Sequence, residues 1–194
     1  MAQREAEQRA QDRNHLKKLL QERCFIQGTF RLASGKTSSV YFDCRRATLD
    51  PQGLVLISDL LLDLVEDLRQ GGLAINAVGG PSLGADPIAA GVALRSFQRQ
   101  RPLPAFLVRS AAKTHGTGRL IENDIPAGTS VLVVEDVVTS GGSVRKAIDR
   151  ILESGLVIAA VACIVDREEG GRQTLAPYGF HPLFTRSQLE SSSE

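Results

Sequence analysis

The chain has 194 residues, 42% of them hydrophobic, which is enough to bury a substantial core, and its length predicts one domain over residues 1–194. Lys and Arg total 23 against 22 Asp and Glu. The formal net charge is therefore +1, and no global field favours a nucleic-acid or anionic-membrane partner. The chain has no apolar run of about eighteen residues and no hydrophobic signal segment, which predicts a soluble, cytoplasmic protein.

The first part of the chain predicts a helix followed by a small hairpin. Residues 1–24 are rich in Gln, Arg and Glu, with leucines at helical spacing in the later part, and the first ten residues are expected to be frayed or loosely docked. Residues 30–45 indicate two short strands about a Ser-Gly turn.

A helix and a strand-turn-helix unit are expected next. Asp50-Pro51 is typical of a helix start, and an apolar stripe continues to Gly71-Gly72, where the helix should end. Residues 74–78 predict a strand, residues 79–85 a glycine-rich turn, and Asp86-Pro87 the cap of the following helix. Glycines at such a turn let backbone N–H groups approach an anion, although a plain tight turn fits as well.

Residues 104–109 predict another strand, and a polar, glycine-rich stretch follows over residues 110–122. A polar segment of this length without apolar periodicity favours a mobile functional loop over packed structure. Either an anion site or a solvated basic loop accounts for its cluster of basic side chains, namely Arg109, Lys113, His115 and Arg119.

The most informative stretch is residues 131–143. Residues 131–134 are an unbroken β-branched and aliphatic run, typical of a buried central strand in a parallel sheet. Two acids, Glu135 and Asp136, come next, and a hydroxyl- and glycine-rich turn then opens a helix. Free N–H groups at a helix N-terminus suit a phosphate, and carboxylates accept hydrogen bonds from a diol. A phosphorylated sugar fits this layout; the alternative is an ordinary strand end followed by a helix cap.

The last part of the chain completes the predicted sheet. Residues 158–165 indicate a buried strand that leads to Arg167 in an acidic turn, residues 182–185 an edge strand, and residues 191–194 a disordered end. Strands alternate with helices, which predicts an α/β fold with a parallel sheet flanked by helices on both faces. Neither a disulfide framework nor a zinc site is indicated by the three widely spaced cysteines, Cys24, Cys44 and Cys163.

The stretch 131–143 resembles the phosphoribosyl pyrophosphate (PRPP) motif of type I phosphoribosyltransferases, an apolar strand, two acids, two apolar residues and a Thr-Thr/Ser-Gly-Gly-Ser turn. The resemblance implies an N-terminal helix and hood over about residues 1–48, a core over about residues 49–186 and a tail over residues 187–194. It also implies that Glu135 and Asp136 hold the ribose hydroxyls. The 5′-phosphate would then be held by Thr139, Ser140, Gly141, Gly142 and Ser143.

Further motifs resemble those of orotate phosphoribosyltransferases and follow in the same order along the chain. Residues 30–45 look like the hood that covers the base, residues 79–87 like the pyrophosphate loop, residues 109–116 like the flexible active-site loop, and residues 165–170 like Val-Asp-Arg-x-x-Gly. Lysines common in relatives are replaced here at three positions, Ala33, Gly84 and Ser110.

The resemblance assigns each candidate residue a role. Orotate would be bound by Arg167, Thr139, Tyr41 and Phe42. The pyrophosphate would be bound by Arg109, Lys113, His115, Gly80, Pro81 and Ser82, and catalysis would rest on Lys113, His115, Arg109 and Asp136. An aromatic pair in a strand also fits core packing, and an arginine in an acidic turn also fits an exposed position.

The implied activity is Mg²⁺-dependent transfer of ribose 5-phosphate from PRPP to orotate, giving orotidine 5′-monophosphate and pyrophosphate. The metal is expected to be held mainly by the substrate, without direct protein ligands. The implied partners are PRPP, orotate and a second copy of the chain that shares the active site. Two alternatives remain, a purine or xanthine phosphoribosyltransferase and a PRPP-sensing regulator without catalysis.

Overall fold

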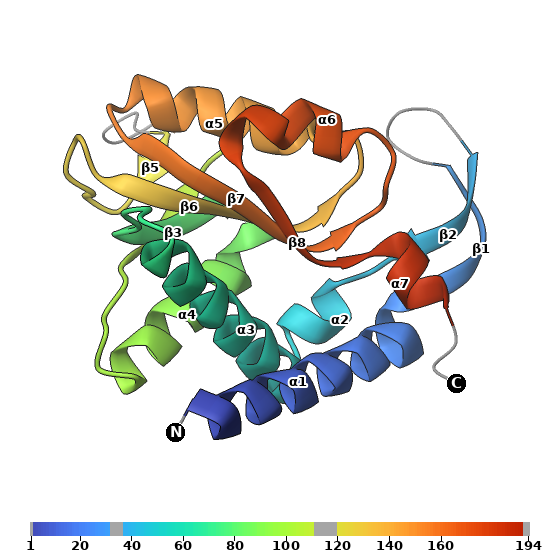
Figure 1. The fold of residues 1–194 in the computed structure, drawn as a ribbon. Helices are drawn as coiled ribbons and strands as arrows, with labels where there is room; N and C mark the ends of the chain where they lie inside the picture. Colours follow the sequence, from blue (N-terminus) through green and yellow to red (C-terminus); the bar gives the residue numbers. More distant parts are fainter. Residues whose placement is uncertain (1, 32–36, 111–119, 192–194) are drawn as a thin grey trace.

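A six-stranded sheet forms the centre of the molecule, with its strands in the order β5-β4-β3-β6-β7-β8 (Figure 1). The computed structural model describes residues 2–31, 37–110 and 120–191. The strands are β3 (Ala77–Pro81), β4 (Ala105–Val108), β5 (Ile121–Glu122), β6 (Ser130–Val138), β7 (Val157–Asp166) and β8 (Phe180–Thr185). Neighbouring strands are parallel except β5, which pairs antiparallel with β4. The predicted parallel α/β sheet is confirmed, and β8 is the expected edge strand.

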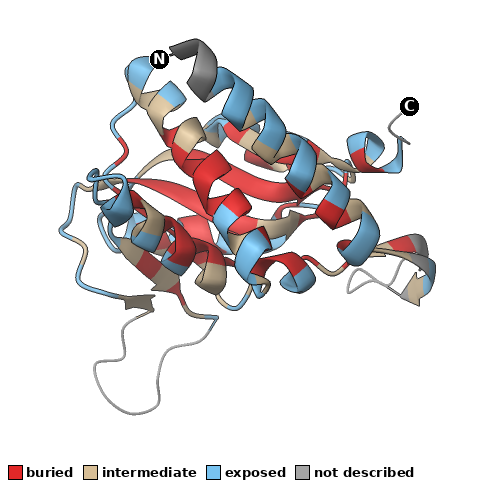
Figure 2. Cartoon of the chain, turned by 90° about the horizontal axis from the view of Figure 1, so that it is seen from below, coloured by how far each residue is buried: buried red, intermediate tan, exposed pale blue. Residues whose placement is uncertain are grey.

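Helices cover both faces of the sheet, as expected from the alternating pattern. α3 (Pro51–Gln70) and α4 (Ala85–Gln98) lie on one face, and α5 (Gly142–Glu153) and α6 (Gly171–Leu175) lie on the other (Figure 1). Successive residues of β6 serve the two faces: Leu132 belongs to the α3–α4 core and Val133 to the α5 core, and both are fully buried. Figure 2 shows buried residues in the sheet and on the helix faces turned toward it.

The start of α3 follows the predicted capping pattern. The side chain of Asp50 accepts a hydrogen bond from the N–H of Gly53 at 2.8 Å, and Pro51 is the first helical residue. This cap satisfies one backbone donor that the helix itself leaves unpaired. The helix ends at Gln70, immediately before the two glycines, as predicted.

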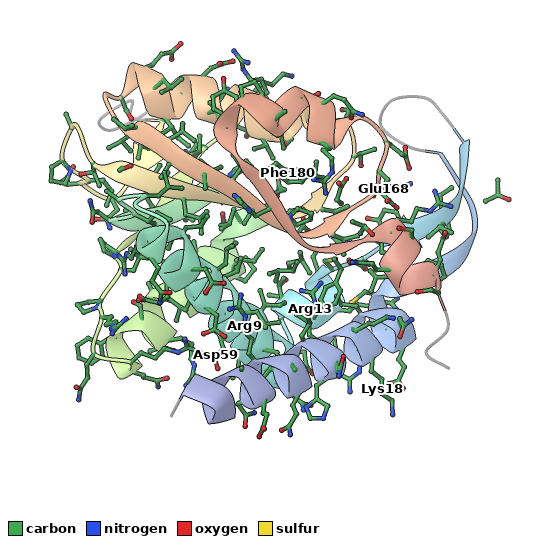
Figure 3. The ribbon with its side chains drawn as sticks, in the orientation of Figure 1. Arg9, Arg13, Lys18, Asp59, Glu168 and Phe180 are labelled. Atoms are coloured by element: carbon green, nitrogen blue, oxygen red, sulfur yellow. The ribbon has the colours of Figure 1, made fainter. Side chains whose placement is uncertain are left out.

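The N-terminal region forms a long helix and a separate two-stranded sheet. α1 (Ala2–Leu19) continues into a π-helix, η1 (Leu20–Cys24), and then into the antiparallel pair β1 (Phe25–Arg31) and β2 (Thr37–Phe42), which is the expected hairpin. A short helix, α2 (Arg45–Thr48), joins this hood to α3. Arg9 of α1 pairs with Asp67 of α3 at 2.6 Å, and the guanidinium of Arg13 lies 4.4 Å from the Phe184 ring centroid, so α1 contacts both α3 and β8 (Figure 3).

The strand β3 begins and ends later along the chain than predicted. β3 starts at Ala77, and residues 79–81 belong to the strand rather than to the turn. Gly79 can sit inside a central strand because its neighbours approach closely: a Cβ there would collide with the carbonyl and ring of Phe106. α4 consequently starts at Ala85 with Gly84 as its N-cap residue, so Asp86 lies inside the first turn and is not the predicted cap.

The C-terminal part contains helices that the sequence pattern did not indicate. α6 is followed by a 3₁₀ turn, η2 (Ala176–Tyr178), and the predicted tail includes α7 (Arg186–Glu190). Residues 192–194, most of the stretch expected to be disordered, lie outside the described ranges. All three cysteines are buried and free of disulfide bonds. Over the described ranges, no helix combines the length and the apolar character that a membrane span requires.

Candidate active site at the carboxyl ends of the parallel strands

The acid pair lies within the last residues of β6, because the strand continues to Val138, four residues beyond the apolar run over residues 131–134. Glu135 is 6% exposed, and one of its carboxylate oxygens accepts a hydrogen bond from the Ser143 hydroxyl at 3.3 Å. Asp136 accepts the N–H of Val137 through its side chain at 2.7 Å. The structure therefore brings the predicted ribose-binding acids and the predicted phosphate turn into direct contact.

Burial changes the ionisation of this acid pair. Desolvation, followed by repulsion from Asp136, raises the pKa of Glu135 to about 8. Burial also raises the pKa of Asp136. Two adjacent carboxyl groups in a desolvated position share their protons, so the pair holds a proton at neutral pH until a ligand supplies donors or positive charge.

The phosphate turn over residues 139–143 connects β6 to α5 and packs against the start of α6. Gly141 is the N-cap residue of α5 and has a φ of 80°, a left-handed conformation that glycine adopts without strain. Behind the turn, a Cβ on Gly171 at the start of α6 would lie 3.0 Å from the Thr139 carbonyl oxygen. Ser140 and Ser143 face solvent. Because the first N–H groups of a helix have no partner within it, this turn can hold an anion.

The turn between β3 and α4 lies against the acid pair. A Cβ at Gly84 would lie 2.5 Å from Oε1 of Glu135 and 2.7 Å from Oδ1 of Asp136. Real Cβ atoms do not approach oxygen atoms so closely, so only glycine fits here in the observed arrangement. The predicted ribose and pyrophosphate regions thus adjoin each other.

The three residues predicted to bind pyrophosphate through the β3 turn differ in position. Gly80 and Pro81 belong to β3, and Gly80 is buried, where a Cβ would collide with the carbonyl of Val134. Ser82 lies in the turn and is half-buried. Pyrophosphate contact by any of them stays a prediction, and Ser82 has the most suitable position.

The basic loop is only partly described. Lys113, His115 and Arg119 lie outside the described residues, whereas Arg109 stands at the end of β4. The guanidinium of Arg109 pairs with Glu122 at 3.0 Å, and the backbone N–H of Arg109 donates to the Leu120 carbonyl at 2.9 Å. The two ends of the segment are therefore joined at one place.

Arg150 is a residue whose role at this place the sequence reasoning missed. From the last turn of α5, its guanidinium donates to the carbonyl oxygen of Ser110 at 2.8 Å and also to that of Arg109. The helix that begins at the phosphate turn thus also holds the start of the basic loop. No local sequence signal marks this contact, because Arg150 and Arg109 are distant along the chain.

Arg167 follows β7 and is buried, not exposed in an acidic turn. It is 3% exposed, and its N–H donates to the Val138 carbonyl at 2.9 Å. Its guanidinium pairs with Glu169 at 2.9 Å and donates to the carbonyl of Val40 in the hood at 3.4 Å. The guanidinium already pairs with a carboxylate in this structure, so a contact of Arg167 with a ligand carboxylate stays a prediction.

The two aromatic residues of β2 differ in burial. Adjacent strand residues point to opposite faces, so the side chains of Tyr41 and Phe42 lie in different surroundings. Phe42 is buried and packs edge-on against Phe25, with 5.4 Å between ring centroids, which gives it a core role. Tyr41 is half-buried beside Phe30 at 5.5 Å. A contact of Tyr41 with the base stays a prediction.

Comparison with known proteins agrees with this geometry. Residues 52–179 match the family model of the phosphoribosyl transferase domain. The chain is 40% identical to an orotate phosphoribosyltransferase of Nostoc sp., covering 92% of this chain and 85% of the relative. It is 41% identical to an orotate phosphoribosyltransferase of Pyrococcus furiosus, covering 90% of this chain and 92% of the relative.

A solved structure, Mycobacterium tuberculosis H37Rv orotate phosphoribosyltransferase in complex with 5-phospho-α-D-ribosyl 1-diphosphate (PRPP), has a TM-score of 0.75 and 31% identity to this chain. The match covers 93% of this chain and 99% of that one. From the matching family model and these relatives, we conclude that the chain belongs to the orotate phosphoribosyltransferase family of enzymes.

Proposed function

We propose that this enzyme transfers ribose 5-phosphate from PRPP to N1 of orotate, giving orotidine 5′-monophosphate and pyrophosphate. The observation that carries the proposal is that the Glu135–Asp136 pair contacts both the turn over residues 139–143 and the turn at Gly84. These three features offer acceptors for a diol, donors for a phosphate and an adjoining backbone for a pyrophosphate. One molecule with all three groups, PRPP, matches them together.

In this proposal each side chain has a distinct task. Glu135 and Asp136 accept hydrogen bonds from the ribose hydroxyls, and the turn at the start of α5 binds the 5′-phosphate. Arg167 binds the carboxylate side of orotate from beneath the hood. Breaking the C1–O bond leaves positive charge on the sugar and negative charge on pyrophosphate, so Arg109, Lys113 and His115 assist by placing positive charge on the leaving group.

The acid pair also fits a role beside Mg²⁺. Its oxygen atoms are hard donors of the kind that Mg²⁺ prefers, and they adjoin the turn assigned to the pyrophosphate. Among the described residues, no group of three His, Cys, Asp or Glu side chains is arranged to hold a metal ion. In this proposal Mg²⁺ would be held mostly by the oxygen atoms of PRPP and would neutralise charge on the pyrophosphate.

A turnover assay tests the proposal directly. With Mg²⁺ and PRPP present, orotate should disappear in a spectrophotometric assay, with one pyrophosphate released for each orotate consumed. Use of a purine base without orotate turnover would establish the first alternative. Binding of PRPP in calorimetry without turnover of orotate or any purine would establish a regulator.

Binding of PRPP is expected to release a proton near neutral pH. The raised pKa of Glu135, about 8, means that the free pair is protonated at pH 7. Ribose hydroxyls and a nearby cation favour the ionised form, so the pKa falls on binding and the affinity should rise between pH 6 and pH 8. Calorimetry in buffers of different ionisation enthalpy should show up to about one proton released per site. Glu135→Gln should abolish this release, and equal heats in all buffers for the wild-type chain would contradict the assignment.

We also propose a homodimer in which each copy completes the site of the other. Exposed apolar side chains near both ends of α4 support an interface: Leu94 and Phe97 toward its C-terminal end are 60% and 72% exposed, and Leu83 in the preceding turn is 82% exposed. Large exposed apolar side chains grouped on one element are typical of interaction surfaces. Leu83 precedes Gly84 in the turn that contacts the acid pair, so a partner covering Leu83 would lie beside the active site.

Subunit complementation should follow from this arrangement. A Lys113→Ala chain and an Asp136→Asn chain each have low activity alone when PRPP is kept well below the dissociation constant of the Asp136→Asn chain. Mixing them should recover activity, because one site of the mixed dimer would carry neither change. The recovered activity should approach that of one unchanged site in each mixed dimer. A verified mixed dimer that stays inactive would contradict the shared site, and an Asp149→Asn chain mixed with Lys113→Ala provides the control for dilution of active subunits.

A further inference from the structure

The residue after Arg167 has an unusual backbone conformation. Glu168 has a φ of 59°, in the left-handed region that residues with a side chain seldom adopt. Such a residue persists only where its surroundings hold it, and such residues concentrate at functional sites. The contacts of Glu168 must therefore hold it in this conformation.

Three hydrogen bonds hold Glu168 in place. Its N–H donates to Oδ1 of the buried Asp166 at 2.9 Å. Both of its carboxylate oxygens bind one residue of α7: the N–H of Ser187 donates at 2.8 Å and the Ser187 hydroxyl donates at 3.0 Å. Figure 3 shows Glu168 beside α7. The turn after β7 is thus fixed from outside the core, by a helix that follows it in the chain.

The same helix also approaches the partner of Arg167. Glu169 pairs with the Arg167 guanidinium at 2.9 Å, and the guanidinium of Arg186 in α7 lies 3.9 Å from the same Glu169 oxygen. Contacts from α7 thus reach both acids that follow Arg167. Glu169 in turn fixes the orientation of the planar guanidinium.

α7 is itself anchored to the rest of the molecule. Its first residues form a capping box in which Thr185 and Gln188 bind each other's backbone N–H groups. Leu189 is buried, and its carbonyl accepts a hydrogen bond from the side chain of Gln21 at 2.9 Å. A helix held at both ends can hold the turn beside it in one position.

We propose that Ser187 and Glu168, which we call the α7 latch, position Arg167 for the acceptor base. The latch residues are positioning residues, since they are proposed to act through Arg167, and the inference rests on the proposed function of Arg167. Because a guanidinium recognises a carboxylate only in a planar, aligned arrangement, a turn that shifts without the latch weakens the acceptor and not PRPP. The α7 latch therefore sets the KM for orotate.

Steady-state kinetics of latch variants tests this inference. Ser187→Ala and Glu168→Gln are expected to raise the KM for orotate on the order of tenfold, with the KM for PRPP and the melting temperature unchanged. Ser187→Thr, which keeps both donors, should restore the wild-type value. Ser191→Ala is the matched control, because that hydroxyl donates to the Gln188 carbonyl at 3.0 Å within the same helix. The double variant Ser187→Ala/Glu168→Gln should be no worse than Glu168→Gln alone, since the Ser187 hydroxyl is proposed to act only through the Glu168 carboxylate.

The outcomes separate the latch from the proposed function. Equal changes in the KM for orotate and PRPP, or no change in either, would overturn the latch while leaving orotate as the substrate. Hydrogen exchange supplies a readout without turnover: backbone amides of residues 167–171 should exchange faster in Ser187→Ala than in Ser191→Ala. If the wild-type chain consumes no orotate, the proposed function falls, and unchanged exchange in Ser187→Ala would then overturn the latch as well.

Discussion

Replacing Lys113 with alanine is expected to lower kcat by a hundredfold or more, about 3 kcal/mol in transition-state stabilisation. Pyrophosphate gains negative charge as the C1–O bond breaks, so a cation near it favours the transition state more than the bound substrate. Ala33, Gly84 and Ser110 stand where the family resemblance implies lysines, which leaves few other cations to share this task. Steady-state kinetics and PRPP calorimetry should show a large loss of kcat with nearly unchanged PRPP affinity.

The control for this substitution is Lys18→Ala, which removes a lysine with a 74% exposed side chain on α1 and should leave kcat unchanged. An equal loss in both variants would point to damaged folding. A Lys113→Ala enzyme that keeps more than a tenth of wild-type kcat would contradict the central role of Lys113.

Asp136→Asn is expected to raise the dissociation constant for PRPP by tenfold or more. Hydrogen bonds to a charged group contribute about 1.5–3 kcal/mol, and the amide keeps the shape of the carboxylate while losing its charge. The retained side-chain oxygen can still accept the N–H of Val137, now at 2.7 Å from Asp136, so the local backbone should stay in place. Calorimetric titration with PRPP measures the change.

Asp149→Asn makes the same substitution on the exposed face of α5, where Asp149 pairs with Arg145 at 3.0 Å, and should leave PRPP affinity unaltered. Unchanged affinity in Asp136→Asn would remove Asp136 from the PRPP site. A lowered melting temperature confined to Asp136→Asn would instead indicate a structural role for the carboxylate.

Much of the core, and the part of the site at the end of β6, could be predicted from the sequence because their signals are local. The continuous apolar runs of β6 and β7 require burial on both faces, which places them at the centre of a parallel sheet. Glu135 follows such a run directly, so its place at the carboxyl end of a strand was fixed by the strand itself. Asp50-Pro51 likewise carries its own capping signal, and α3 begins there.

Other features depend on contacts between distant parts of the chain, which local patterns do not encode. Gly79 is a strand residue only because Phe106 on the neighbouring strand lies so close to it. Arg167 is buried because the hood closes over it and Val40 supplies a carbonyl. α7 did have a local signal, the Thr185-x-x-Gln188 capping pattern, which its short length concealed.

The glycine at position 84 also constrains how this sequence can diverge. A lysine at this position would have to displace the carboxylates of Glu135 and Asp136, since its Cβ would collide with both before its ammonium group reached any ligand. A chain with a lysine at this place would therefore need a different path of the backbone in this turn, or differently oriented acids. Position 84 and the acid pair are thus expected to change together in evolution, and grafting that lysine alone into this chain would damage ribose binding instead of adding a useful cation.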